Sequence, residues 1–197
     1  MMLPTDQQQY REECTLRTTF LEGMSHTAST VSVITTDGPA GRAGVTVSAM
    51  SSVSADTTAP LLLVCLHQAS SACPVILKNG VFCVNVLRDD QSHISDVFAG
   101  RVKSEHDNKF ACADWITEKT GAPRIVEPLV SFDCRIAQAE LIGTHHVVFG
   151  EVAEVFLASR GVPLIYANRD YRRLAGPEPI RCGNQFCEKS HAYDNAA

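Results

Sequence analysis

The sequence lacks any segment that would cross a membrane, and it lacks an excess of basic residues. Its longest apolar run, Pro60–Leu66, has the length of a strand, whereas a membrane-spanning helix needs about 20 apolar residues. The 17 Lys and Arg are outnumbered by 22 Asp and Glu, which gives a formal net charge of −5. Proteins bind nucleic acid largely through basic contacts with phosphates. We therefore expect neither a membrane nor a nucleic acid as a partner.

We also expect no secretion signal, since the first residues, Met1–Asp6, lack the long apolar stretch of a signal peptide. We therefore expect a cytoplasmic protein whose eight cysteines are reduced. Several of them lie in apolar runs, where a free Cys behaves as a small hydrophobic residue. Cys182, Cys187 and His191 have a faint metal-site pattern, but their spacing is loose and a fourth ligand is missing. We expect no metal site.

Two common catalytic signatures are absent as well. Gly38, Gly41 and Gly44 are spaced GxxGxxG between two predicted strands, and not GxGxxG at the start of a helix. A pyridine nucleotide would therefore bind without a Rossmann site. No Ser/His/Asp or paired-carboxylate pattern is evident. The tandem pair His145 and His146 is a poor metal site, because adjacent residues of a strand point to opposite sides.

The chain does contain a series of short segments rich in β-branched residues. Its length of 197 residues fits one domain, and a hydrophobic fraction of 45% can build a core. Helices are predicted over 10–24, 70–79 and 91–100, and strands over 29–36, 43–49, 61–67, 81–87, 130–142, 147–157 and 163–166. The first two strands form a hairpin, and residues 143–146 join the two long ones. This order predicts a mainly β fold, an antiparallel barrel of six or seven strands with a few flanking helices.

The composition also predicts how the chain is divided. We expect an N-terminal segment over 1–15, one domain over 16–174, and a polar extension over 175–197, where the pattern of strands has ended.

A hydroxyl-rich segment, Thr46–Ser54, holds one Thr and four Ser. Hydroxyls and free backbone N–H groups suit a phosphate or the edge of a flavin ring. The same composition is typical of an ordinary edge strand that runs into a turn. Ser70 and Ser71 allow two interpretations in the same way, as a helix N-cap or as phosphate ligands.

Several segments, in order along the chain, resemble the flavin reductase-like family, whose members share an FMN-binding split barrel. The first is the run Val31–Thr36, Gly44–Ala49 and Ser52–Ser54. The others match the family patterns F-x-V-N-x-L, F-A-G, G-[DT]-H and L-x-Y-x-x-R-x-Y/F; they are Phe82–Leu87, Phe98–Gly100, Gly143–His145 and Leu164–Tyr171. Within the family, the chain is most similar to the reductase components of two-component aromatic hydroxylases, such as those acting on 4-hydroxyphenylacetate, phenol and chlorophenol.

The resemblance implies a Greek-key split β-barrel, a homodimer and an oxidoreductase that uses NADH to reduce FAD or FMN. It also implies a separate flavin-dependent monooxygenase, which hydroxylates an aromatic compound with the reduced flavin. Two alternatives remain open. One is a flavin-binding barrel without turnover. The other is a flavoprotein oxidase like pyridoxamine-phosphate oxidase, for which a basic phosphate cluster is not evident.

The resemblance also implies the site residues. The isoalloxazine edge would be lined by Thr46, Val47, Ser48 and Ala49, the ribityl chain and phosphate by Ser51, Ser52 and Val53, and the other side of the phosphate by Ser70 and Ser71. Asn85 would lie on the neighbouring strand. His145, the one catalytic residue expected, would lie on the nicotinamide side, with Arg169 and Tyr171 nearby. Two departures from the family pattern are a longer loop over 54–60 and Thr144 in place of the commoner Asp.

Overall fold

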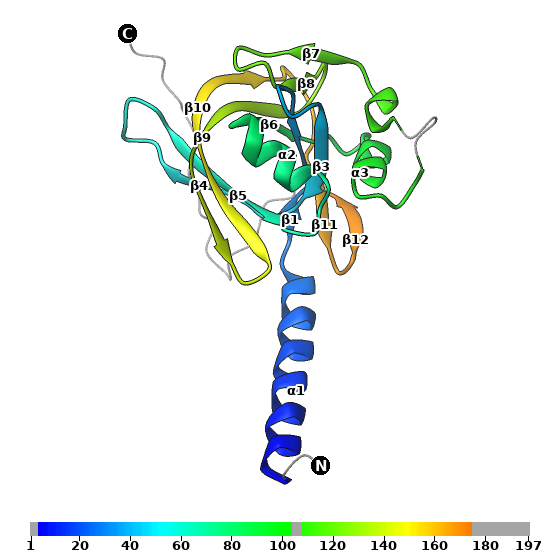
Figure 1. Cartoon of the computed structure of the whole chain (residues 1–197). Coiled ribbons are helices and arrows are strands. Elements are labelled where there is room, and N and C mark those ends of the chain that lie inside the picture. Colours follow the sequence, from blue (N-terminus) through cyan, green and yellow to red (C-terminus); the bar gives the residue numbers. More distant parts are fainter. Residues whose placement is uncertain (1–3, 104–107, 175–197) are drawn as a thin grey trace, which may run out of the picture.

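A seven-stranded antiparallel sheet forms most of the molecule (Figure 1). The computed structural model of the chain describes residues 4–103 and 108–174. Every neighbouring pair of strands in this sheet is antiparallel, so the predicted mainly β, antiparallel fold is confirmed. In pairing order the strands are β3 (Ala43–Val47), β2 (Ser32–Thr36), β6 (Val81–Val86), β9 (Val130–Ile142), β10 (His145–Leu157), β5 (Leu61–His67) and β4 (Met50–Ser54).

The two edge strands, β3 and β4, are consecutive in the chain and are separated only by Ser48 and Ala49. A sheet whose outermost strands are two residues apart has to curl back on itself. β3 and β4 do not pair with each other, so the curled sheet is split along this line. We call residues 46–53 the seam segment. The predicted barrel is therefore a split one, closed by the chain but not by hydrogen bonds.

One core fills the inside of the curled sheet. Helix α2 (Ala72–Asn79) lies within the curve of the strands (Figure 1). It ends at Gly80, whose φ of 70° is the left-handed conformation typical of a helix C-cap. Alternate residues of the strands point inward and pack against the helix. The buried members of this inner core are Ile34, Val47, Leu62, Val64, Leu66, Ala72, Cys73, Ile76, Phe82, Val84, Val86, Cys134 and Val148.

A second core covers the outer face of β2 and β6. Its buried members are Val31, Val33, Leu87, Ile94, Val97, Phe98, Ile125 and Leu164. The elements around it are α3 (Ser92–Phe98), the 3-10 helix η2 (Lys109–Cys112), the sheet of β1 (Ser29–Thr30), β11 (Leu164–Ala167) and β12 (Asp170–Arg173), and the pair β7 (Trp115–Thr117) and β8 (Pro123–Ile125). Gly44 lets α3 approach β3, because a Cβ there would lie 2.6 Å from Cε1 of Phe98.

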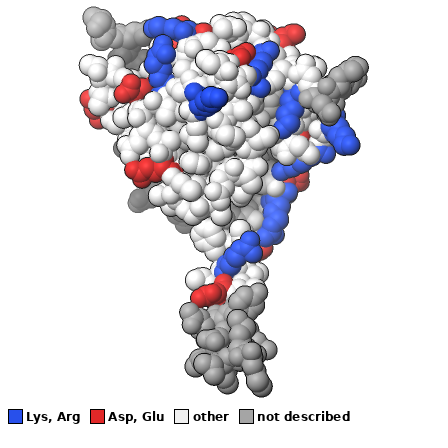
Figure 2. All heavy atoms as spheres, in the orientation of Figure 1, with Lys and Arg blue, Asp and Glu red and all other residues white. Residues whose placement is uncertain are grey.

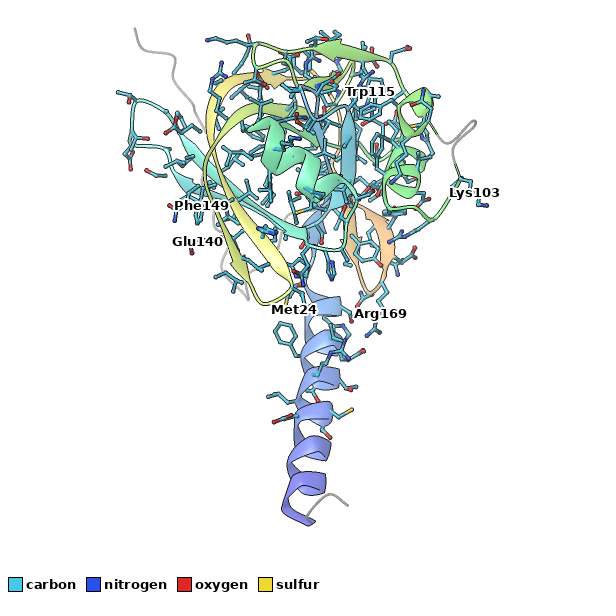
Figure 3. All side chains as sticks on the ribbon, in the orientation of Figure 1. Met24, Lys103, Trp115, Glu140, Phe149 and Arg169 are labelled. Atoms are coloured by element: carbon cyan, nitrogen blue, oxygen red, sulfur yellow. The ribbon has the colours of Figure 1, made fainter. Side chains whose placement is uncertain are left out.

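Helix α1 (Pro4–His26) projects from the body of the molecule (Figure 1). Its C-terminal end is held by the turn between β11 and β12, where Asn168 donates its N–H to the Ser25 carbonyl and Arg169 pairs with Glu22, both at 2.6 Å. Figure 3 shows Arg169 at the end of this hairpin. The helix is longer than predicted and runs through the expected boundary at residue 15. It exposes a stripe of apolar side chains: Leu16, Phe20, Leu21 and Met24.

Several predicted element boundaries are wrong, and four strands were not predicted. The strand expected over 43–49 ends at Val47, because the chain leaves β3 there to begin β4. β10 begins at His145 rather than at residue 147, so the turn before it consists of Gly143 and Thr144. β4 lies in the hydroxyl-rich segment, which the sequence did not divide into two strands. The pairing of the short strands β7, β8 and β12 depends on distant packing, and the sequence did not predict them.

The predicted extension over 175–197, with Cys182, Cys187 and His191, lies outside the described residues. Within residues 4–103 and 108–174, no three His, Cys, Asp or Glu side chains are grouped so that they could hold a metal ion. No helix in that part of the chain is both long and apolar enough to cross a bilayer.

Gly150 allows β10 to pass close to the interior side chains. A Cβ there would lie 2.5 Å from Cζ of Phe82, which is fully buried, and 3.0 Å from Cβ of Cys134. We predict that Gly150→Ala lowers the free energy of unfolding by about 1–3 kcal/mol, because a packed interior must shift to admit the methyl group. Chemical denaturation measures this change. Gly23→Ala, at a position with no heavy atom within 4 Å, is the control; an equal loss in both variants would contradict the prediction.

Candidate active site

The seam segment presents small side chains along an open strand edge. Ser48, Ala49, Ser51, Ser52 and Val53 are exposed, and Val53 lies where a β-bulge interrupts the register with β5. Among the described residues β4 pairs with β5 alone, so its other edge carries backbone N–H and C=O groups without a strand partner. Such an edge can donate hydrogen bonds to the oxygen atoms of a flat ring or a phosphate.

One group of side chains beside the seam centres on Ser95 of α3. Thr46 donates from Oγ1 to the Ser95 carbonyl at 2.7 Å. The Tyr171 hydroxyl lies 2.8 Å from both Ser95 Oγ and Asp96 Oδ1. Arg101 donates to Asp96 at 3.2 Å and to the Tyr171 hydroxyl at 3.1 Å. We call these five residues the Ser95 group; it joins the seam to β12.

The Ser95 group offers both a neutral hydroxyl and a cation. Burial raises the pKa of Tyr171, so its hydroxyl keeps its proton at physiological pH. The Arg101 guanidinium lies over the rings of Tyr166 and Tyr171, 5.6 and 5.5 Å from their centroids. These contacts hold the guanidinium against an aromatic surface while half of the Arg101 side chain stays exposed.

A second group lies at the ends of β5 and β10. His67 and His145 are directly opposite each other in the antiparallel pair, and their ring centroids are 4.8 Å apart at an interplanar angle of 79°. Nδ1 of His145 lies 3.0 Å from Oγ1 of Thr144. The Thr144 carbonyl accepts a hydrogen bond from the Gln68 N–H at 2.9 Å. We call His67, Thr144 and His145 the histidine group.

The strands β4, β5 and β10 place the histidine group beside the seam. The Ala49 carbonyl accepts from the Cys65 N–H at 3.1 Å, and Cys65 is opposite Val147. Leu66 faces the inner core, so Cys65 and His67 on either side of it face outward. Ala49 is therefore two strand spacings from Val147, and His145 lies two residues farther along β10. This places Ala49 about 12 Å from His145.

Most of the predicted site residues lie around this region. Thr46, Ser48, Ala49 and the serines of β4 form the seam, with Tyr171 on one side and His145 on the other. Ser70 lies next to His67, since the Ser70 N–H donates a hydrogen bond to the His67 carbonyl at 2.9 Å. Ser70 Oγ accepts from the Ala72 N–H at 3.3 Å, while Ser71 is exposed at the start of α2.

Val47 and Arg169 have other contacts in this structure. The Val47 side chain is buried in the inner core, so only its backbone could reach a ligand. Arg169 pairs with Glu22 of α1, and this hydrogen bond lowers the pKa of the Glu22 carboxyl.

Asn85 is fully buried, and its amide links three strands. Nδ2 donates to the Val33 carbonyl at 3.1 Å and to Thr35 Oγ1 at 3.0 Å, while Oδ1 accepts from the Ile125 N–H at 2.8 Å. Both amide ends are therefore used inside the protein. This geometry gives Asn85 a structural role in the fold, and its predicted place among the cofactor-binding residues stays a prediction.

No sequence motif indicated a role for His67, Ser95, Asp96 or Arg101. Ser95 and Asp96 lie in a segment that was predicted only as a helix, and their link to Thr46 and Tyr171 depends on how α3 packs. The sequence predicted His67 as the last residue of a strand. Its position opposite His145 follows only from the register of β5 with β10.

Comparison with known proteins assigns the chain to a family. Residues 24–175 match the flavin reductase like domain, so the chain belongs to this family and the resemblance seen in its motifs is confirmed. It is 43% identical over 159 residues to the FMN reductase (NADH) RutF of Escherichia coli O139:H28, a match that covers 81% of this chain and 94% of that protein.

Solved structures give the same result. A putative flavin reductase from Haemophilus somnus 129PT is 34% identical with a TM-score of 0.74, over 80% of this chain and 98% of that one. Nitrilotriacetate monooxygenase component B from Mycobacterium thermoresistibile is 28% identical with a TM-score of 0.75, over 87% and 95% of the two chains. The residues in the family match include the seam, the Ser95 group and the histidine group.

We predict that Asn85→Ala destabilises the fold without weakening a ligand contact. The change leaves the buried Val33 carbonyl and Ile125 N–H without their partner, which costs about 2–4 kcal/mol of unfolding free energy. Denaturant unfolding gives the loss, and flavin titration of the folded variant gives its affinity. Gln138→Ala, at an exposed amide bonded to Glu140, is the control and should change stability by less than about 0.5 kcal/mol. Weaker flavin binding at unchanged stability would instead assign Asn85 to the pocket.

Proposed function

We propose that this protein is an NADH-dependent flavin reductase, which transfers a hydride from NADH to FMN or FAD and supplies the reduced flavin to a separate flavin-dependent monooxygenase. The observation that carries the proposal is the identity of 43% with an FMN reductase (NADH) over 94% of that protein's length. The name of that relative favours FMN as the acceptor. FAD is the alternative acceptor, because the family resemblance of the sequence includes both flavins.

The geometry of the seam supports this function. NADH and oxidised flavin themselves supply the hydride donor and acceptor, so the protein needs to bind and orient them. The open edge of β4 offers backbone N–H groups to the flavin, and its small side chains leave space for a flat ring. Donors fixed beside the ring edge stabilise the negative charge that develops there on reduction. The histidine group, about 12 Å from Ala49, borders the space where the nicotinamide would stack.

The distribution of charge supports the binding of two phosphate-bearing molecules. On the face seen in Figure 2, Lys and Arg side chains gather along the side that carries α3 and β12 and continue onto α1. Arg172 and Arg173 belong to β12 and Arg101 follows α3, and each of them forms an ion pair with an Asp. A local excess of cations attracts phosphates even though the chain as a whole is acidic.

The partner in this proposal is a separate oxygenase. Nitrilotriacetate monooxygenase component B, which shares the fold over nearly its whole length, is by its name one component of such a system. The exposed seam would allow reduced flavin to leave after the hydride step. The aromatic substrate predicted for the oxygenase stays a prediction, since no residue of this chain would contact it.

A homodimer is part of the same proposal, with α1 as its contact surface. Leu16, Phe20, Leu21 and Met24 are each at least half exposed on a helix that projects from the body. Isolated helices are marginal in water, because most helical stability in proteins comes from packing an apolar face. A second copy that packs on this stripe would supply that contact.

We predict that Phe20→Glu converts the dimer to a monomer, because a charge placed at the centre of an apolar contact has no partner there. The dissociation constant measured by sedimentation should rise at least about tenfold. Thr18→Glu, on the opposite side of the same helix turn, is the control and should leave the dimer intact. A monomeric wild type, or equal effects of the two substitutions, would contradict the assignment of this surface.

The reductase function is tested by NADH oxidation with added FMN or FAD. We predict that Ser48→Ala and Ser52→Ala raise the KM for flavin about three- to tenfold, the value of a lost hydrogen bond, while kcat changes less than about twofold. Ser159→Ala, beyond the far end of β10, is the matched control.

The possible outcomes separate the proposal from its alternatives. Flavin affinity that is unchanged in both seam variants would contradict the assigned pocket. Flavin binding without NADH oxidation would indicate a flavin-binding module, and oxidation of an amine by tightly held FMN would indicate an oxidase.

A further inference from the structure

His67 has no substrate contact in the proposed function, yet its ring is the neighbour of His145. Directly opposite residues of an antiparallel pair have their Cβ atoms about 5 Å apart on the same face of the sheet. His67 and His145 hold this relation, and their rings meet edge to face with centroids 4.8 Å apart. This arrangement is one of the two that aromatic pairs prefer.

The orientation of the His67 ring is fixed by its own backbone. Its Nδ1 accepts a hydrogen bond from the Ala69 N–H at 3.0 Å. Because this bond requires an unprotonated Nδ1, the neutral ring carries its proton on Nε2. Two further hydrogen bonds hold the backbone after His67. The Ser70 N–H donates to the His67 carbonyl and the Gln68 N–H donates to the Thr144 carbonyl, both at 2.9 Å.

His145 is thereby confined from two sides. The His67 ring lies against it, and Thr144 Oγ1 lies 3.0 Å from its Nδ1. In the part of the chain that the structure describes, Nε2 of His145 has no hydrogen-bond partner. An exposed histidine at the first residue of a strand would otherwise sample several rotamers.

We propose that His67 is a positioning residue, whose ring holds the His145 imidazole in one orientation and leaves Nε2 of His145 directed to the nicotinamide of NADH. The contact between the rings stands on the geometry alone, while its effect on NADH rests on the proposed function. His67 acts through His145 and does not touch the substrate. Its loss therefore matters only while His145 is present.

The ring contact is tested by NMR of the histidine side chains in the full chain, with His145→Ala to assign the resonances. In the wild type we expect a cross-relaxation signal between the two rings and a shift of the His145 ring protons by the His67 ring current. His67→Phe keeps an aromatic neighbour and should retain the shift, whereas His67→Ala should lose it. His93→Ala, at an exposed histidine of α3, is the control. His145 resonances that do not respond to His67→Ala would overturn the proposal, whether or not the protein reduces flavin.

The consequence for NADH is tested by a double-mutant cycle. His67→Ala should raise the KM for NADH about two- to tenfold, the range expected from an edge-to-face pair, and leave the KM for flavin within about twofold. His67→Phe should restore most of the loss, and His67→Ala should add nothing to His145→Ala. The positioning role would be overturned if His67→Ala raised the KM for NADH by the same factor in the wild type and in the His145→Ala variant. It would also be overturned if His145→Ala left the NADH kinetics unchanged. A wild type that never oxidises NADH would refute the proposed function, and the NMR result would still decide the ring contact.

Discussion

The two-residue link between β3 and β4 is the constraint on which the structure depends. Ser48 and Ala49 connect the two outermost strands of a seven-stranded sheet. Two strands that are separated by only two residues cannot lie at opposite ends of a flat sheet. The sheet therefore curls around α2, and its interior is filled by side chains that alternate along each strand. The seam stays open, since β3 and β4 do not pair, and this leaves the outer edge of β4 without a strand partner among the described residues.

The same constraint explains where the candidate site lies. On one side of the seam, packing of α3 on β3 brings Ser95 to Thr46 and to Tyr171. On the other side, the pairing of β5 with β10 brings His67 to His145. Neither group has the arrangement of a nucleophile with its base, which agrees with a reaction whose chemistry belongs to two bound ring systems. The protein contributes a backbone edge, small side chains and fixed neighbours.

Much of this fold could be predicted from the sequence, because alternation and turn residues are local signals. The first hairpin, the helix α2 and the two long strands were predicted correctly. The break between β3 and β4 was not, since the hydroxyl-rich run continues through it without a Gly or Pro. The residues of the seam were singled out by resemblance, and their contact with flavin stays a prediction. The buried amide of Asn85, the bond from Thr46 to Ser95 and the contact of His67 with His145 join residues far apart in the chain. No local pattern predicts such contacts.

Binding of flavin at the exposed seam is tested by hydrogen exchange of the backbone amides with and without FMN. We expect slower exchange over residues 48–53 when FMN is bound, because the N–H groups on the outer edge of β4 have no strand partner until the flavin supplies one. Exchange at α2 and β6, which are already buried, should not change. Saturating FMN that protects another part of the chain and leaves residues 48–53 unchanged would contradict binding at the seam.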